Sequence, residues 1–186
     1  MDGLIHNEIN ERLDRIVQRF FWLNRVSDAG MSVLANEFTL HRFEEKFHPI
    51  AHLYPLLADR VSEIQKTYNM VTTYHETPLG KKDFVSPLEF FEYNLTEHLA
   101  VQKYIADTVM MIRQGGINDT YGTHSLVASA LGKLLRIFAP YVSQALLLVD
   151  KATSYGEVSF AVQMFDENCN HFIIIDSEQD VPSLFD

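Results

Sequence analysis

Apolar side chains recur every three or four positions through residues 1–151, which is the spacing of an amphipathic helix. The clearest early stripe consists of Leu13, Ile16, Val17 and Phe20. The stripe fades toward Gly30, and we expect a helix to end there because glycine is a poor helix former. A second helix is predicted over residues 32–47, and a third helix extends to about residue 75.

Two prolines leave the start of the third helix open. Pro49 and Pro55 both lack the backbone N–H that a helix interior uses, and proline is accommodated best in a first turn. The helix either begins at Pro49 and kinks near Pro55, or begins at Pro55 and leaves residues 48–54 as a connector.

Two more long helices are predicted after a loop. The sequence Thr-Pro-Leu-Gly-Lys-Lys over residues 77–82 is typical of a loop. Ser86 and Pro87 then suit an N-cap and a first helical position, so we expect a short helix over residues 87–93. A longer helix follows and ends at the glycine pair 115–116, and one further helix runs to about residue 152.

The pattern changes after residue 153. Residues 158–165 are rich in β-branched and aromatic side chains, residues 166–170 are turn-forming, and residues 172–175 are again strand-like. This pattern predicts a β-hairpin, which must pack on the helical body because an isolated hairpin is marginally stable. The predicted division is an N-terminal helical extension (1–31), a helical bundle (32–152) and a hairpin-like tail (153–186).

Charge is distributed unevenly along the 186 residues. The formal net charge is −10, and residues 152–186 carry seven acids and no Lys or Arg. Residues 1–11 also contain no Lys or Arg, which argues against a basic arm that binds nucleic acid. The single cysteine, the absence of an apolar leader and the absence of a long apolar run lead us to expect a cytoplasmic protein with no membrane partner.

Three histidines lie within twelve residues and are accompanied by acids. On a helix, several of these side chains would share one face, with spacings of three, four, seven and four residues. Carboxylates and imidazoles together suit iron, manganese or zinc, although a charged helical face is often only solvated. The candidate metal ligands are His41, Glu45, His48, His52, Asp59 and Glu63.

Several segments between residues 32 and 148 resemble the Dps-like branch of the ferritin superfamily, both in their order along the chain and in their short sequence motifs. The last junction, an acidic residue and then a threonine before an apolar helix, is the part most like the family. The matching segments are His48-Pro49, Leu57–Glu63, Thr77–Gly80, Glu97–Leu99 and Gly115–Thr123.

The resemblance implies a mostly α fold, a ferritin-like four-helix bundle with a short helix in its middle connection. The predicted hairpin would be an addition to that bundle. The resemblance also implies a homo-oligomer built from dimers, up to a dodecameric shell, that oxidises Fe²⁺ and stores iron. In such proteins a di-iron site lies between two subunits, and no catalytic residue is separate from the metal ligands.

Carried over by position, His41 corresponds to the histidine of the first bundle helix and His48 to that of the second. His52 stands where the family has an aspartate, and Glu63 matches the next acid. The following expected glutamate falls at Thr67, which is a poor metal ligand.

Two functions follow from these observations. The first is an iron-binding, Fe²⁺-oxidising storage protein of the Dps-like or ferritin-like type, that is, a ferroxidase. The alternative is a ferritin-like bundle without a metal site or cofactor, which serves assembly or interaction through its acidic tail.

Overall fold

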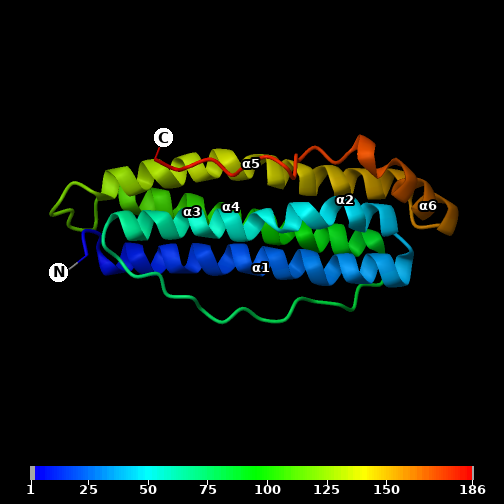
Figure 1. The fold of residues 1–186 in the computed structure, drawn as a ribbon, viewed down its shortest axis with the longest axis horizontal. Helices are drawn as coiled ribbons and strands as arrows, with labels where there is room; N and C mark the ends of the chain where they lie inside the picture. The colour runs from blue at the N-terminus through cyan, green and yellow to red at the C-terminus, as the bar shows by residue number, and fades with distance from the viewer. Residues whose placement is uncertain (1–2, 186) are drawn as a thin grey trace.

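The computed structural model describes residues 3–185 and consists of long helices that lie side by side (Figure 1). Helix α1 (Asn7–Phe38) is followed by α2 (His41–Ala51) and α3 (Leu53–Thr67), which lie end to end along it. A crossover over residues 68–86 then runs the length of the bundle to α4 (Pro87–Arg113), which pairs with α5 (His124–Tyr155). The chain is therefore a four-helix bundle in which α2 and α3 together form one of the four helical segments.

Helix α1 does not end at Gly30. Gly30 lies inside the helix, where a Cβ atom would come within 1.9 Å of the buried Phe90 ring on α4. The glycine thus allows α1 and α4 to approach closely. Helix α1 ends instead at Phe38, and the capping residue Thr39 has φ 60° and donates its backbone N–H to the Leu34 carbonyl. The predicted separate helix over 32–47 is therefore wrong.

The two prolines lie on opposite sides of a break at His52. Pro49 lies inside α2, and Pro55 lies in the first turn of α3, so neither predicted start describes this segment. Because Pro55 has no N–H, it cannot donate to the Ala51 carbonyl four residues earlier. That carbonyl accepts instead from Asn24 Nδ2 of α1 at 3.2 Å.

The crossover begins earlier than the sequence pattern predicted, because α3 ends at Thr67 rather than near residue 75. Its backbone is fixed along α1: Thr73 N donates to Asp14 Oδ1 at 2.8 Å, and Gln18 Nε2 donates to the Glu76 carbonyl at 2.6 Å. These contacts replace the helical hydrogen bonds that the segment lacks.

The predicted start of a helix at Ser86-Pro87 is confirmed, since the Ser86 hydroxyl accepts the Glu89 N–H at 3.2 Å. The predicted short helix in the middle connection is wrong, because α4 continues without a break from Pro87 to Arg113. Helix α5 is long and apolar enough to cross a membrane by length and composition alone, but it packs against α4 as one of the bundle helices.

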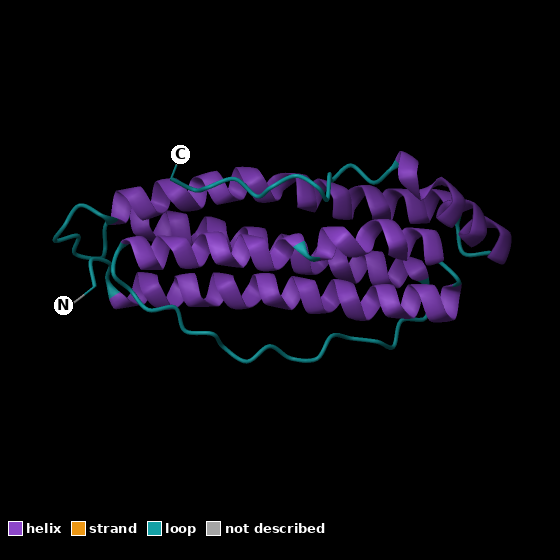
Figure 2. Cartoon of the chain, in the orientation of Figure 1, coloured by secondary structure: helices purple, strands orange, loops and turns teal. Residues whose placement is uncertain are grey.

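The predicted C-terminal hairpin is wrong. Residues 158–165 contribute to helix α6 (Ser159–Asn168), the 3₁₀ turn η1 (Cys169–His171) follows, and no strand occurs among residues 3–185 (Figure 2). Tertiary contacts override the strand propensity here. Asp166 accepts the backbone N–H groups of Arg42 and Phe43 at 3.2 and 2.7 Å, which ties α6 to the start of α2.

Residues 172–185 return along the bundle as an extended tail, which we call the C-terminal strap (Figure 1). Gln144 of α5 donates to the Phe172 carbonyl at 2.9 Å and accepts the Ile174 N–H at 2.5 Å. The predicted domain boundaries at 31/32 and 152/153 both fall inside helices, α1 and α5. Residues 1–2 and 186 of the predicted terminal segments lie outside the described residues.

Candidate metal site

The interior of the bundle contains aromatic rings and neutral polar groups. Phe20 of α1 packs edge-on against Phe138 of α5, and Phe138 stacks on His98 of α4 at 5.7 Å between ring centroids. Among residues 3–185, the buried carboxylates are Asp14 and Asp166, and both accept backbone N–H groups. The described interior therefore does not offer the cluster of carboxylates that a di-iron centre between four helices needs.

A buried hydrogen-bonded pair, Tyr54 and His98, lies in this interior. His98 Nδ1 is 2.7 Å from the Asn94 carbonyl, which can only accept, so Nδ1 carries the hydrogen. His98 Nε2 therefore accepts from the Tyr54 hydroxyl at 2.8 Å. Burial lowers the pKa of His98 to about 4 and raises the pKa of Tyr54 well above its usual value. Both groups are neutral at pH 7, which fits a satisfied core pair.

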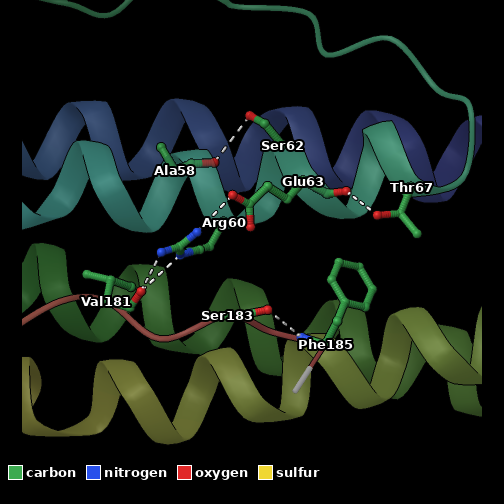
Figure 3. Close-up of polar contacts among 8 residues, drawn as sticks. All are labelled: Ala58, Arg60, Ser62, Glu63, Thr67, Val181, Ser183 and Phe185. Carbon is green, nitrogen blue, oxygen red and sulfur yellow. Dashed lines mark hydrogen bonds and ion pairs between the residues drawn. The ribbon is translucent and has the colours of Figure 1, made fainter.

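Glu63 is part of an ion pair rather than a metal cluster. Its carboxylate lies 2.8 Å from Arg60, and Arg60 also donates to the Val181 carbonyl of the C-terminal strap at 2.7 and 3.0 Å (Figure 3). Glu63 follows His48 by fifteen residues, which is roughly 20 Å along a helical segment. Within one chain, Glu63 therefore does not meet the histidines. Thr67 donates its hydroxyl to the Glu63 backbone carbonyl.

The other predicted ligands lie on the outer surface of the same segment. His41, Glu45 and Asp59 are exposed. His41 precedes His48 by two turns, and Asp59 follows His52 by two turns, about 10 Å away in each case. Glu45 lies one turn before His48, and no hydrogen bond or ion pair joins it to a histidine.

His48 and His52 are brought together. They lie one turn apart at the junction of α2 and α3, with their Nε2 atoms 2.9 Å apart and their rings nearly perpendicular. On the other side of His48, Nδ1 lies 3.8 Å from Asp28 Oδ1 of α1. The side chains of His48 and Asp28 are 47% and 40% exposed, so this cluster is open to solvent.

Two imidazole nitrogens at this separation can bind one metal ion. Metal–nitrogen bonds of about 2.0–2.1 Å place two neighbouring ligand nitrogens about 3 Å apart. Asp28 does not complete the site, because it faces Nδ1 while the opposite nitrogen of His48 faces His52. Consistent with this, residues 3–185 contain no group of three or more His, Cys, Asp and Glu side chains placed to hold an ion. One chain thus offers a two-nitrogen site with open positions.

Two features of the site were not predicted from the sequence, because they depend on the packing of α1 on α2 and of α3 on α4. The place of Asp28 beside His48 follows from the antiparallel packing of α1 on α2. His98 is 1% exposed and is buried against Tyr54 of α3. A regular apolar pattern on both sides of His98 is the signal that could have indicated its burial.

Comparison with known proteins identifies the fold. No protein-family model matches the chain. No curated protein matches it either. Among solved structures, it is similar to one described as a closed form of Archaeoglobus fulgidus ferritin engineered by site-directed mutagenesis, with a TM-score of 0.76 and 17% sequence identity. The match covers 92% of this chain and 98% of that chain, so the chain has the ferritin-like four-helix fold.

Proposed function

We propose that this chain is a ferritin-like metal-binding protein that takes up a transition metal through His48 and His52 on the outside of the bundle. The observation that supports the proposal is the 2.9 Å separation of the two Nε2 atoms. Imidazole nitrogen suits Fe²⁺, Zn²⁺, Co²⁺ and Ni²⁺, and disfavours Mg²⁺ and Ca²⁺. Iron is the metal that the ferritin-like fold and the Dps-like sequence motifs favour.

Iron oxidation and storage are the further parts of this proposal. Two imidazoles leave most coordination positions of Fe²⁺ free for water, an oxidant or additional ligands. In a Dps-like arrangement those additional ligands come from a second subunit of a cytoplasmic homo-oligomer. An exposed site on α2 and α3 is accessible to such a partner, whereas a site among the buried rings is not.

The test is metal binding by the full chain. Metal-free protein is dialysed anaerobically against Fe²⁺ and, separately, against Co²⁺, and bound metal per chain is measured by elemental analysis. We expect about one ion per chain for the wild type and loss of that ion in His48→Ala and His52→Ala. His171→Ala removes an exposed histidine of η1 that is not among the candidate ligands; it is the matched control and should retain the ion. Equal metal content in wild type and His48→Ala would overturn the proposal.

A second candidate function is assembly or interaction without metal chemistry, and the C-terminal strap is the observation that favours it. Val181 and Leu184 of the strap are buried, while Ile174 and Phe185 remain 56% and 45% exposed and could contact another chain. Light scattering on the full chain and on a chain ending at His171 tests this function. If the strap drives assembly, the shortened chain forms particles with fewer subunits; an unchanged number of subunits per particle would exclude that role.

A further inference from the structure

The edge between α1 and α2 carries a continuous set of polar contacts that ends at the histidine pair. Asn24 Nδ2 donates to Asp28 Oδ2 at 3.1 Å and to the Ala51 carbonyl at 3.2 Å. Asp28 Oδ1 then faces His48 Nδ1, and His48 Nε2 faces His52 Nε2. Asn24 thereby uses the carbonyl left free before Pro55 to fix the Asp28 carboxylate in place.

The positions of the hydrogens follow from these contacts. A carboxylate can only accept, so Asp28 favours the His48 tautomer with hydrogen on Nδ1. His48 Nε2 then has a free lone pair. In the metal-free protein it accepts a hydrogen from His52 Nε2, since two bare nitrogens would repel at 2.9 Å.

Asp28 has an unused oxygen for this role. Its Oδ1 atom is buried and has no hydrogen-bond partner, and the 3.8 Å to His48 Nδ1 is an ion-pair distance rather than a hydrogen bond. A hydrogen bond from His48 Nδ1 would satisfy that oxygen. A carboxylate behind a ligating histidine fixes the ring and its tautomer in many metal sites.

We propose that Asp28 is the positioning residue of the His48–His52 metal site. It acts through His48: it holds hydrogen on Nδ1 and aims the free Nε2 lone pair at the point that His52 Nε2 also reaches. The inference rests on the proposed metal binding by the two histidines. The ligand class is a divalent transition ion that accepts two imidazole nitrogens and completes its coordination with water.

The test combines a measurement without metal and a measurement with Co²⁺. In the metal-free protein, nitrogen–proton correlation spectra of the imidazole rings report the tautomer of His48. We expect the Nδ1–H form in the wild type and a shift toward the Nε2–H form in Asp28→Ala. Equilibrium dialysis should show a Co²⁺ dissociation constant about 10- to 100-fold higher in Asp28→Ala.

Two further variants separate positioning from charge and from folding. Asp28→Asn keeps an acceptor oxygen, so it should retain more of the Nδ1–H form and more Co²⁺ affinity than Asp28→Ala. Glu37→Ala removes an exposed carboxylate from α1, the helix that carries Asp28, and should change neither measurement. Thermal unfolding of each variant shows whether the bundle is intact.

The outcomes distinguish this inference from the proposed function. If the wild type and His48→Ala bind Co²⁺ equally, the proposed metal site fails, and the inference that depends on it fails with it. If His48→Ala loses Co²⁺ while Asp28→Ala matches the wild type in both tautomer and affinity, the metal site stands and the role of Asp28 is overturned. A loss of affinity in Asp28→Ala that Glu37→Ala reproduces would also overturn it.

Discussion

Replacing Gly30 by alanine tests the close packing of α1 on α4. A Cβ at this position would lie 1.9, 2.3 and 2.6 Å from three atoms of the Phe90 ring. Phe90 is fully buried and packs against the rings of Phe84 and Phe91, so it has little room to move. Overpacking typically costs about 1–3 kcal/mol, and this contact falls at the upper end. Alanine gains about 1 kcal/mol in helix propensity, so the net loss is about 2 kcal/mol.

The assay is chemical and thermal unfolding, followed by circular dichroism at one fixed protein concentration. A loss of about 2 kcal/mol lowers the melting temperature by about 4–8 °C in a protein of this size. Gly132→Ala is the matched control, because Gly132 lies inside α5 and an added methyl group would meet nothing within 4 Å. This variant should be more stable than the wild type by about 0.5–1 kcal/mol. A Gly30→Ala variant as stable as the wild type would refute the packing argument.

Three further changes have defined outcomes. Burial lowers the pKa of His98 to about 4, so between about pH 4 and 6.5 the unfolded chain binds a proton at His98 that the folded chain does not. The free energy of unfolding should therefore fall as the pH drops through that window. Urea titrations of His98→Gln should show a smaller fall. Arg60→Ala removes two hydrogen bonds to Val181, so hydrogen exchange should speed up in the strap and not in α1, with the exposed Lys66→Ala unchanged. Burial and nearby Asp166 raise the pKa of the Cys169 thiol. Iodoacetamide at pH 7.5 should therefore modify this thiol only after the chain is unfolded in urea. Rapid labelling of the folded chain would contradict the burial of Cys169.

The helical body was predictable from the sequence because its apolar stripes are long and regular. The start of α4 was predictable because Ser86 and Pro87 are a local signal whose meaning does not depend on the rest of the fold. The predicted stop at Gly30 failed for the opposite reason. The same residue can end a helix or let two helices touch, and only the position of Phe90 decides between them.

The predicted hairpin in the C-terminal region was wrong for a related reason. Val158, Phe160 and Val162 have strand propensity, but the segment is short, and its structure is set by contacts of α6 and of the strap with α2, α3 and α5. The candidate site was predictable in part. The spacing of His48 and His52 places them one turn apart on any helix, whereas Asp28 reaches them only through the packing of α1.

The position of bound metal decides whether the histidine pair or the buried interior is the binding site. Crystals of the full chain grown with Co²⁺ give an anomalous difference signal at the cobalt absorption edge. The proposed His48–His52 site requires a peak about 2.0–2.1 Å from Nε2 of both histidines, and none beside His98 among the buried rings. A peak inside the bundle, or protein saturated with Co²⁺ and no peak at the histidine pair, would contradict it.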